Sequence, residues 1–238
     1  MNDISPPRQA NHFHKQYKDP GLPYNDGPKQ VKHISKLLRL GLILFIPLAA
    51  FQAAITIYIL VDMPGYISLV SFNANPDSYL LNTIYGLAII YRLTYIYCIV
   101  MTCWFLFRAA RNLNTVSPDL LKYSPHFAWA WFFIPFANFF KPYQMVTSID
   151  RFTKEAAGSG TPANALIPTW WILFILSVFI GATDISFPIA SVFSVALIAD
   201  ILSGALAIVA AVMFMQVTGE IAEHQGHLQS AGVAQVFD

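Results

Sequence analysis

Two side chains of opposite charge, Arg92 and Asp200, stand inside long apolar runs of the chain. Each lies about eleven residues from the outer end of its run, or about 16 Å at the rise of an α-helix. A lone charge at the centre of a membrane costs roughly 2.5–3.5 kcal/mol. We therefore expect Arg92 and Asp200 to pair, with Gln52 in nearly the same layer, so that the three residues form an intramembrane polar layer.

This predicted polar layer has two interpretations. It could serve a proton or ion relay, or hold the headgroup of a ligand. It could equally be a clamp between helices that fixes their register, a role that has to be argued separately for each buried ion pair. A relay usually needs several titratable groups in a chain, and the sequence shows no such chain around Arg92 and Asp200.

The composition places these residues in a membrane protein. The chain has 238 residues, of which 56% are hydrophobic and 11% charged, whereas a soluble domain has about 25% charged residues. A membrane core needs about 20 helical residues to cross, and four runs are long enough: 37–61, 80–107, 166–185 and 189–217. These runs predict an all-α polytopic integral membrane bundle with four transmembrane helices. A disordered basic tail (1–36) is expected before this membrane domain (37–218), and a second tail (219–238) after it.

A fifth apolar run, 127–140, is short, rich in aromatic residues and interrupted by Pro135. Runs of 10–14 residues are more often re-entrant or interfacial than spanning. If this run does not cross, all of the 14 Lys and Arg residues except Arg92 fall on one side. Positive charge marks the cytoplasmic side. We therefore predict an interfacial or re-entrant segment and both termini in the cytoplasm of a bacterial inner membrane. The alternative is a short, tilted fifth span.

Catalytic and cofactor motifs are missing from the sequence. It contains no HExxH, GxSxG, P-loop or GxGxxG pattern. Cys98 and Cys103 are five residues apart, which is neither a redox nor a metal spacing. The paired histidines near each end lack a third ligand, and the basic tail lacks a folded nucleic-acid module. We expect no metal, no cofactor and no nucleic acid, and an enzyme is the least supported class.

The block 104–144 carries an ordered set of Trp, Arg, Asn and Pro residues. A WxxxRxxxN pattern is followed by Ser-Pro and then by W-x-F-x-P-x-x-N-x-x-x-P, and its residues are Trp104, Arg108, Asn112, Ser124, Pro125, Trp131, Phe133, Pro135, Asn138 and Pro142. This block resembles a group of bacterial membrane proteins known as domain of unknown function 4328, with motif and flanking runs covering about 37–220. The resemblance implies a polytopic bacterial membrane protein and implies no activity.

The polar residues of this block suggest two roles. Arg108 and Asn112 are four residues apart and share one helical face, while Arg108 and Arg111 could reach the last carbonyls of their helix or a lipid phosphate. Together with Asn138 they could simply pin the aromatic segment against the second span. They could also form a cytoplasm-facing pocket for a lipid headgroup or a small anion.

These observations favour a non-enzymatic membrane component, one that binds lipid or a membrane partner and works as an accessory subunit. The alternative is a small transporter or channel-like protein that uses the layer of Arg92 and Asp200. The partners expected are the bilayer, anionic lipid headgroups, and a second copy or another membrane protein. Small residues at four-residue spacing, Ala199, Ser203, Ala207 and Ala211, allow close helix packing within the bundle or across a homodimer seam.

Overall fold

The computed structural model describes residues 31–62, 78–116, 121–182 and 193–237, and over these residues every regular element is a helix. The elements are α1 (Lys32–Asp62), α3 (Ser78–Val116), α4 (Phe127–Ala130), the 3-10 helix η1 (Ala137–Phe139), α5 (Lys141–Ala156), α6 (Leu166–Gly181) and α7 (Phe193–Phe237). The all-α prediction is confirmed for this part of the chain. The tail 1–30 lies outside the described residues, and α1 already begins within the predicted tail, at Lys32.

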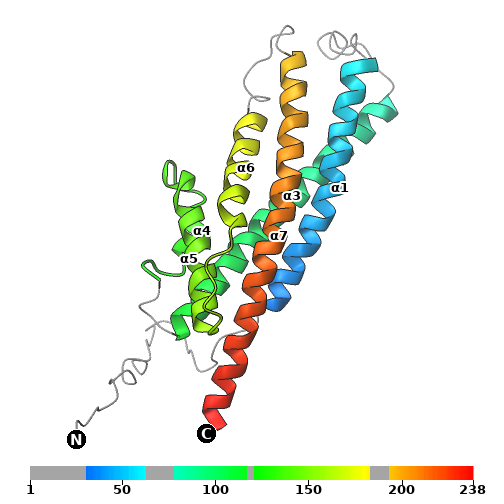
Figure 1. The fold of residues 1–238 in the computed structure, drawn as a ribbon. Coiled ribbons are helices and arrows are strands. Elements are labelled where there is room, and N and C mark those ends of the chain that lie inside the picture. Colours follow the sequence, from blue (N-terminus) through cyan, green and yellow to red (C-terminus); the bar gives the residue numbers. More distant parts are fainter. Residues whose placement is uncertain (1–30, 63–77, 117–120, 183–192, 238) are drawn as a thin grey trace, which may run out of the picture.

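The long helices form a bundle in which α1 packs between α3 and α7, and α7 packs in turn against α6 (Figure 1). The shorter helices α4 and α5 lie beside α3, α6 and α7 near one end. Helix α7 runs without a break through residues 219–237, so the predicted C-terminal tail is a continuation of the last helix. α1 begins, and α3 and α7 end, at the same end of the bundle.

Three of these helices, α1, α3 and α7, are long and apolar enough to cross a membrane. The predicted third span differs, because α6 has only 16 residues. At 1.5 Å per residue it is about 24 Å long, less than the roughly 30 Å of a hydrocarbon core. The rest of that predicted span, from residue 183, lies outside the described residues.

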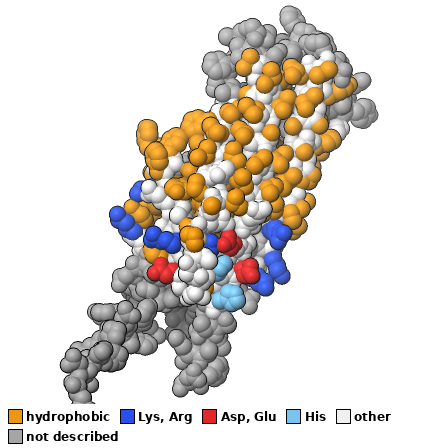
Figure 2. Space-filling model, in the orientation of Figure 1, with side chains coloured by type: hydrophobic (Ala, Val, Ile, Leu, Met, Phe, Trp, Pro, Cys, Tyr) orange, Lys and Arg blue, Asp and Glu red, His pale blue; other side chains and the backbone are white. Residues whose placement is uncertain are grey.

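The outer faces of the bundle are apolar. On α3, one such face carries Ile89, Leu93, Ile96, Val100 and Trp104, each more than half exposed. Figure 2 shows the same property across the body of the molecule, where hydrophobic side chains cover the visible surface. Helices that are apolar all round are buried in a large core or in a membrane, so these faces fit contact with lipid.

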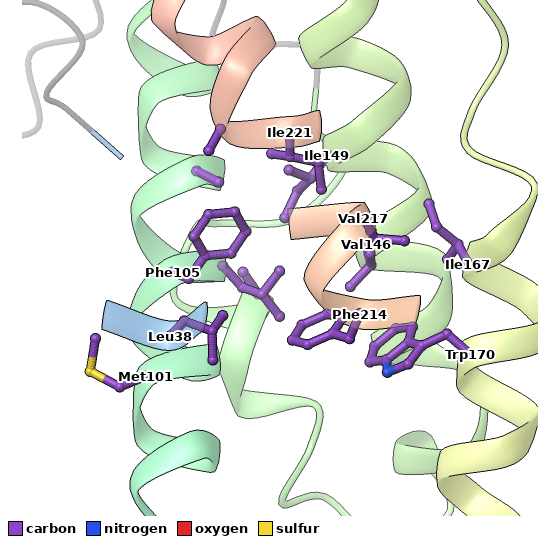
Figure 3. Close-up of a cluster of buried hydrophobic side chains, with 14 of the residues drawn as sticks. Leu38, Met101, Phe105, Val146, Ile149, Ile167, Trp170, Phe214, Val217 and Ile221 are labelled. Carbon is purple, nitrogen blue, oxygen red and sulfur yellow. The ribbon is translucent and has the colours of Figure 1, made fainter. Parts of the chain in front are cut away.

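A tightly packed core lies where the long helices meet α5 (Figure 3). It includes Leu38 of α1, Phe105 of α3, Ile149 of α5 and Val217 of α7, all fully buried. Helix α6 joins through Trp170, whose ring stacks on Phe214 of α7 at 4.4 Å between centroids. Because α5 contributes to this core, it is part of the bundle rather than a loop between spans.

The aromatic run 127–140 is not a continuous helix. It consists of the four-residue α4, a series of turns and η1, and then the chain enters α5. Among the contacts that tie it to α6, Phe132 packs edge-on against Trp171 at 5.8 Å, and the indole Nε1 of Trp171 donates to the carbonyl of Phe139 at 2.8 Å. Elements of three and four residues are too short to cross a membrane as a helix, so the run does not form a helical fifth span.

Charged side chains gather in a belt at one end of the apolar body (Figure 2). The described cations of α1 and α5 include Lys36 and Arg151, and the described acids of α5 and α7 include Glu155 and Glu223. We call this end of the bundle the charged end. Its position is what the one-sided distribution of Lys and Arg predicts for a membrane protein.

This belt makes a testable prediction about sidedness. On a Cys98→Ala/Cys103→Ala background, the exposed positions Lys36→Cys, Glu155→Cys and Glu223→Cys should react with a membrane-impermeant maleimide from the same side. Val61→Cys, near the other end of α1 and 66% exposed, should be protected from reagent added to that side. Labelling of Glu155→Cys and Lys36→Cys from opposite sides would contradict the arrangement.

Helices α1 and α3 cross closely at Gly41. A Cβ added at this glycine would lie 2.5 Å from Cε1 of Tyr97 and 3.2 Å from Sγ of Cys98. The Tyr97 hydroxyl donates to the carbonyl of Leu37, one turn away, at 3.1 Å. The missing side chain at Gly41 therefore makes room for a tyrosine that joins the two helices.

We expect Gly41→Ala to lower stability by about 1–3 kcal/mol, the usual cost of overpacking. The measurement is the thermal unfolding midpoint in one detergent. Gly204→Ala is the matched control, because an added Cβ there meets nothing within 4 Å. In a Tyr97→Ala background, Gly41→Ala should lower the stability little further. If Gly41→Ala destabilises that background as much as the wild type, the added Cβ clashes with a residue other than Tyr97.

Candidate functional site

At the charged end, a buried ammonium group joins two helices. The Nζ of Lys154 on α5 lies 3.2 Å from Oδ2 of Asp150, one turn earlier, and 2.7 Å from Oε1 of Glu220 on α7. The side chain of Lys154 is 3% exposed and that of Asp150 is fully buried, whereas that of Glu220 is 35% exposed. Buried charges have to be paired to be tolerated, so this triad links α5 to α7.

The connection from α5 to α6 is tied into the same triad. Lys154 Nζ also donates to the carbonyl of Pro162 at 3.2 Å, and the backbone N–H of Asn164 donates to Asp150 Oδ2 at 2.7 Å. The side-chain Nδ2 of Asn164 also donates to Oε2 of Glu220. The small polar residues 156–165 suggest a flexible link, but these bonds hold its far end against α5 and α7.

The charge state of Lys154 follows from these contacts. Burial by itself lowers the pKa of Lys154, but hydrogen bonds and charges from Glu220 and Asp150 outweigh it and leave the pKa raised from 10.5. The lysine is therefore held as a cation between two acids. One oxygen of the cluster, the buried Oδ1 of Asp150, has no hydrogen-bond partner among the described residues.

A second buried network lies further along α7. The Nδ2 of Asn112 on α3 donates to Oε1 of Gln225 at 2.9 Å, and Nε2 of Gln225 donates to the carbonyl of Ala109 at 3.0 Å. Nε2 also lies 3.3 Å from Oγ1 of Thr153 on α5. Gln225 is 1% exposed, so its amide joins three helices at once.

Several of the predicted motif residues contact neighbours on α3 and α7. Asn112 bonds to Gln225 on α7, and Arg111 has its Cζ 5.7 Å above the ring of Phe107. Arg108 is half-buried, and the buried Oδ1 of Asn138 has no hydrogen-bond partner among the described residues. A pocket built from Arg108, Asn112 and Asn138 stays a prediction.

The remaining motif residues shape the backbone between α3 and α5. The carbonyls of Ser124 and Pro125 accept from the amides of Phe127 and Ala128, which starts α4. Pro142 is buried in the first turn of α5, where proline needs no amide hydrogen. Pro135 and Trp104 are exposed. The motif therefore specifies how the chain turns as well as which side chains it presents.

A pocket of about 380 Å³ opens beside the start of α5. It is lined by Leu121, Lys122, Tyr123, Trp131, Lys141, Tyr143, Gln144, Met145, Thr147 and Ser148. Two of these residues are lysines and three are aromatic. We call it the lysine pocket.

Lys141 is the centre of the lysine pocket. Its Nζ donates to the Tyr123 hydroxyl at 3.0 Å and lies 5.0 Å from the Tyr123 ring centre and 5.6 Å from that of Trp131. The hydrogen bond from Lys141 lowers the pKa of the Tyr123 phenol against the effect of burial, and the charges of Lys141 and Lys122 add to this. The pocket therefore favours negative charge.

A family model, described as a domain of unknown function (DUF4328), matches residues 69–223. The chain belongs to the DUF4328 family. The match includes α3, the aromatic segment, α5, α6 and most of α7, so both buried networks and the lysine pocket fall inside it, apart from Gln225. No curated protein and no solved structure matches the chain.

Deeper in this DUF4328 chain, Thr56 links two residues of the predicted polar layer, Asp200 and Gln52. Oδ2 of Asp200 accepts a hydrogen bond from Oγ1 of Thr56 at 2.8 Å, and Thr56 Oγ1 lies 3.0 Å from the carbonyl of Gln52. Arg92 has an exposed side chain on α3, a helix that has few contacts with α7 because α1 lies between them. The ion pair of Arg92 with Asp200 stays a prediction, and Thr56 is a partner that the sequence did not indicate.

The small residues of α7 pack inside the bundle. The Ser203 hydroxyl donates to the carbonyl of Ser177 on α6 at 2.8 Å, and a Cβ added at Gly181 would lie 2.8 Å from Ser203 Oγ. Ala207 and Ala211 line an apolar cavity of about 90 Å³ together with Cys98 and Cys103. The packing interpretation of the stripe agrees with these contacts, and a homodimer seam remains untested.

The sequence contained a signal for only part of the site. Asp150 and Lys154 have the four-residue spacing of an ion pair on a helix, and this spacing could have marked them. Nothing in the sequence relates them to Glu220 or to Asn164, and nothing relates Lys122 to Lys141. These pairs are distant in the chain and are brought together by packing.

We expect Lys154→Met to lower the unfolding free energy by about 3–5 kcal/mol, because it leaves two acids without their cation. Thermal unfolding in detergent measures this, with the exposed Arg151→Met on the same helix as control. Since the pKa of Lys154 is raised on folding, its stabilising contribution is complete at neutral pH and is lost as pH rises above 10.5. Equal midpoints for Lys154→Met and Arg151→Met would show that the triad contributes nothing.

Proposed function

We propose that this protein is a non-enzymatic membrane component that binds lipid at its charged end and, as an accessory subunit, holds a membrane partner. The lysine pocket is the observation that carries the lipid-binding part. It combines two lysines with aromatic walls, and it belongs to the segment where the chain leaves α3 and enters α5. Tyr and Trp together with cations are typical of the membrane–water interface.

The aromatic segment supports the same proposal. Phe133, Phe136 and Phe140 are 63%, 83% and 66% exposed. Phe136 also has a φ of 62°, a conformation that is uncommon for a bulky residue. Exposed phenyl rings beside lysines fit a segment that rests at headgroup depth, with rings toward the acyl chains and ammonium groups toward phosphate.

The topology that accompanies this function has both termini in the cytoplasm of a bacterial inner membrane. Helices α1, α3 and α7 would cross fully, and α6 would cross with help from the residues that follow it. The charged end would then face the cytoplasm, in keeping with the positive-inside rule.

A transporter that uses Asp200 is less well supported. Asp200 accepts a hydrogen bond from Thr56 on a neighbouring helix, which suits a clamp between α1 and α7. The cavity that Ala207 and Ala211 line is about 90 Å³ and is lined mostly by apolar side chains, which does not suit a path for ions.

Two measurements separate these functions. The purified protein, mixed with zwitterionic and anionic phospholipids in micelles, should retain bound lipid in native mass spectrometry. Asp200→Asn should lower thermal stability without changing lipid retention, and proteoliposomes should show no proton or sodium flux that depends on Asp200. Flux that Asp200→Asn abolishes, with no lipid retained by the wild type, would favour the transporter.

A further inference from the structure

We propose that the lysine pocket binds a phosphate group, supplied by the headgroup of an anionic phospholipid or by a soluble phosphate ester. This inference rests on the proposed lipid-binding function and assigns it to one site. The ligand lies with its phosphate between Lys122 and Lys141, beside the first turn of α5.

The charge of the pocket is not balanced by its own walls. Both lysines line it, and none of the ten described residues that line it is acidic. Lys154, on the same helix, shows the opposite situation, because Asp150 and Glu220 lie within 3.2 Å of its Nζ. Lys141 instead has a neutral phenol as its hydrogen-bond partner. An anion that enters the pocket therefore meets two positive charges and no carboxylate from the described residues that line it.

A hydrogen-bond donor without an acceptor in the part of the chain described belongs to one wall of the same space. Trp131 lines the pocket, and its buried indole Nε1 has no acceptor among the described residues. An unsatisfied buried donor is rare in a folded protein and calls for an acceptor. The phosphate oxygens would supply one, because each can accept more than one hydrogen bond.

The start of α5 adds a further attraction for negative charge. The helix begins Lys141-Pro142-Tyr143, has no acidic residue in its first turn and has no side-chain cap. Pro142 has no N–H and the N–H of Gln144 donates to the carbonyl of Phe140 at 3.1 Å, so the attraction comes from the helix dipole, which makes this end positive. Tyr143 and Gln144, from this turn, line the pocket.

The pocket is also held in shape before any ligand arrives. Lys141 lies within 5.6 Å of two ring centres, and the rings of Tyr123 and Trp131 pack edge-to-face at 5.5 Å. Its volume of about 380 Å³ falls in the range of small-ligand sites, enough for a phosphate and part of its ester substituent. The lowered pKa of Tyr123 agrees with a site that stabilises an anion.

The neighbouring surface favours a lipid as the source of the phosphate. Phe140, directly before Lys141, is 66% exposed, and Phe136 is 83% exposed. These apolar rings lie where acyl chains of a bound lipid would continue from the headgroup. A soluble phosphate ester would use the lysines and the indole but would leave these rings uncovered.

The test uses the full chain in nanodiscs of phosphatidylcholine with increasing phosphatidic acid. Bound lipid is counted by native mass spectrometry, and inorganic phosphate and glycerol phosphate are added as soluble competitors. The variants are Lys141→Gln, the exposed Lys122→Gln and their double variant. Trp131→Phe keeps the ring and removes the N–H. Arg151→Gln, an exposed cation on α5 that does not line the pocket, is the matched control.

We expect the double lysine variant to lose at least about tenfold of the preference for phosphatidic acid, as loss of charge-assisted hydrogen bonds implies. Lys122→Gln alone and Trp131→Phe should each weaken the preference, and Arg151→Gln should keep it. Competition by inorganic phosphate at millimolar concentration would identify a soluble phosphate ester as the source. If neither inorganic phosphate nor glycerol phosphate reduces the amount of bound phosphatidic acid, the source of the phosphate is the lipid.

Two results would overturn the inference. If the double lysine variant keeps the wild-type preference while lipid is still retained, the lysine pocket is not the site and the proposed lipid-binding function survives. If the wild type retains no lipid and neither soluble phosphate binds, both the site and the proposed function fail.

Discussion

A lysine ammonium buried between two carboxylates holds the charged end of this protein together. Lys154 contacts Asp150 on its own helix, Glu220 on α7 and the carbonyl of Pro162 in the connection to α6. Three parts of the chain separated by up to 70 residues in numbering are thereby fixed around one charge. Because an unpaired buried charge is so costly, none of the three can move away alone. The core of Phe105, Ile149 and Val217 and the amide network of Gln225 then pack around a joint that is already specified.

This joint positions the lysine pocket. Helix α5 has its last turns held by Lys154 and Thr153 against α7, and its middle is buried through Met145 and Ile149. The first turn of α5 is therefore fixed in position beside the aromatic segment. There the indole Nε1 of Trp171 on α6 donates a hydrogen bond to the carbonyl of Phe139. One helix thus carries two lysines with opposite surroundings. Lys154 is neutralised by acids and is structural, whereas Lys141 is paired with a phenol and faces a pocket.

The membrane part of the fold follows a different constraint. The outward faces of α1, α3 and α7 are apolar and have no protein to cover them in the part of the chain described, so lipid is the medium that suits them. Polar groups inside this region find partners across helix contacts. Thr56 bonds to Asp200, Tyr97 to Leu37 and Ser203 to Ser177. Each contact occurs where two helices approach closely, and two of them lie beside Gly41 or Gly181.

The sequence by itself determined the helical class, the long apolar helices and the gathering of cations at one end. These properties depend on composition along one stretch of chain and on the solvation rules of a bilayer, so no knowledge of packing is needed. It also identified the residues of the 104–144 block as unusual. Only the tertiary structure decided that α6 is short, that Asn112 binds Gln225, that Asp200 meets Thr56 and that Lys122 and Lys141 share a pocket. Those pairings join residues far apart in the chain, and which of many polar groups meet depends on how the helices pack.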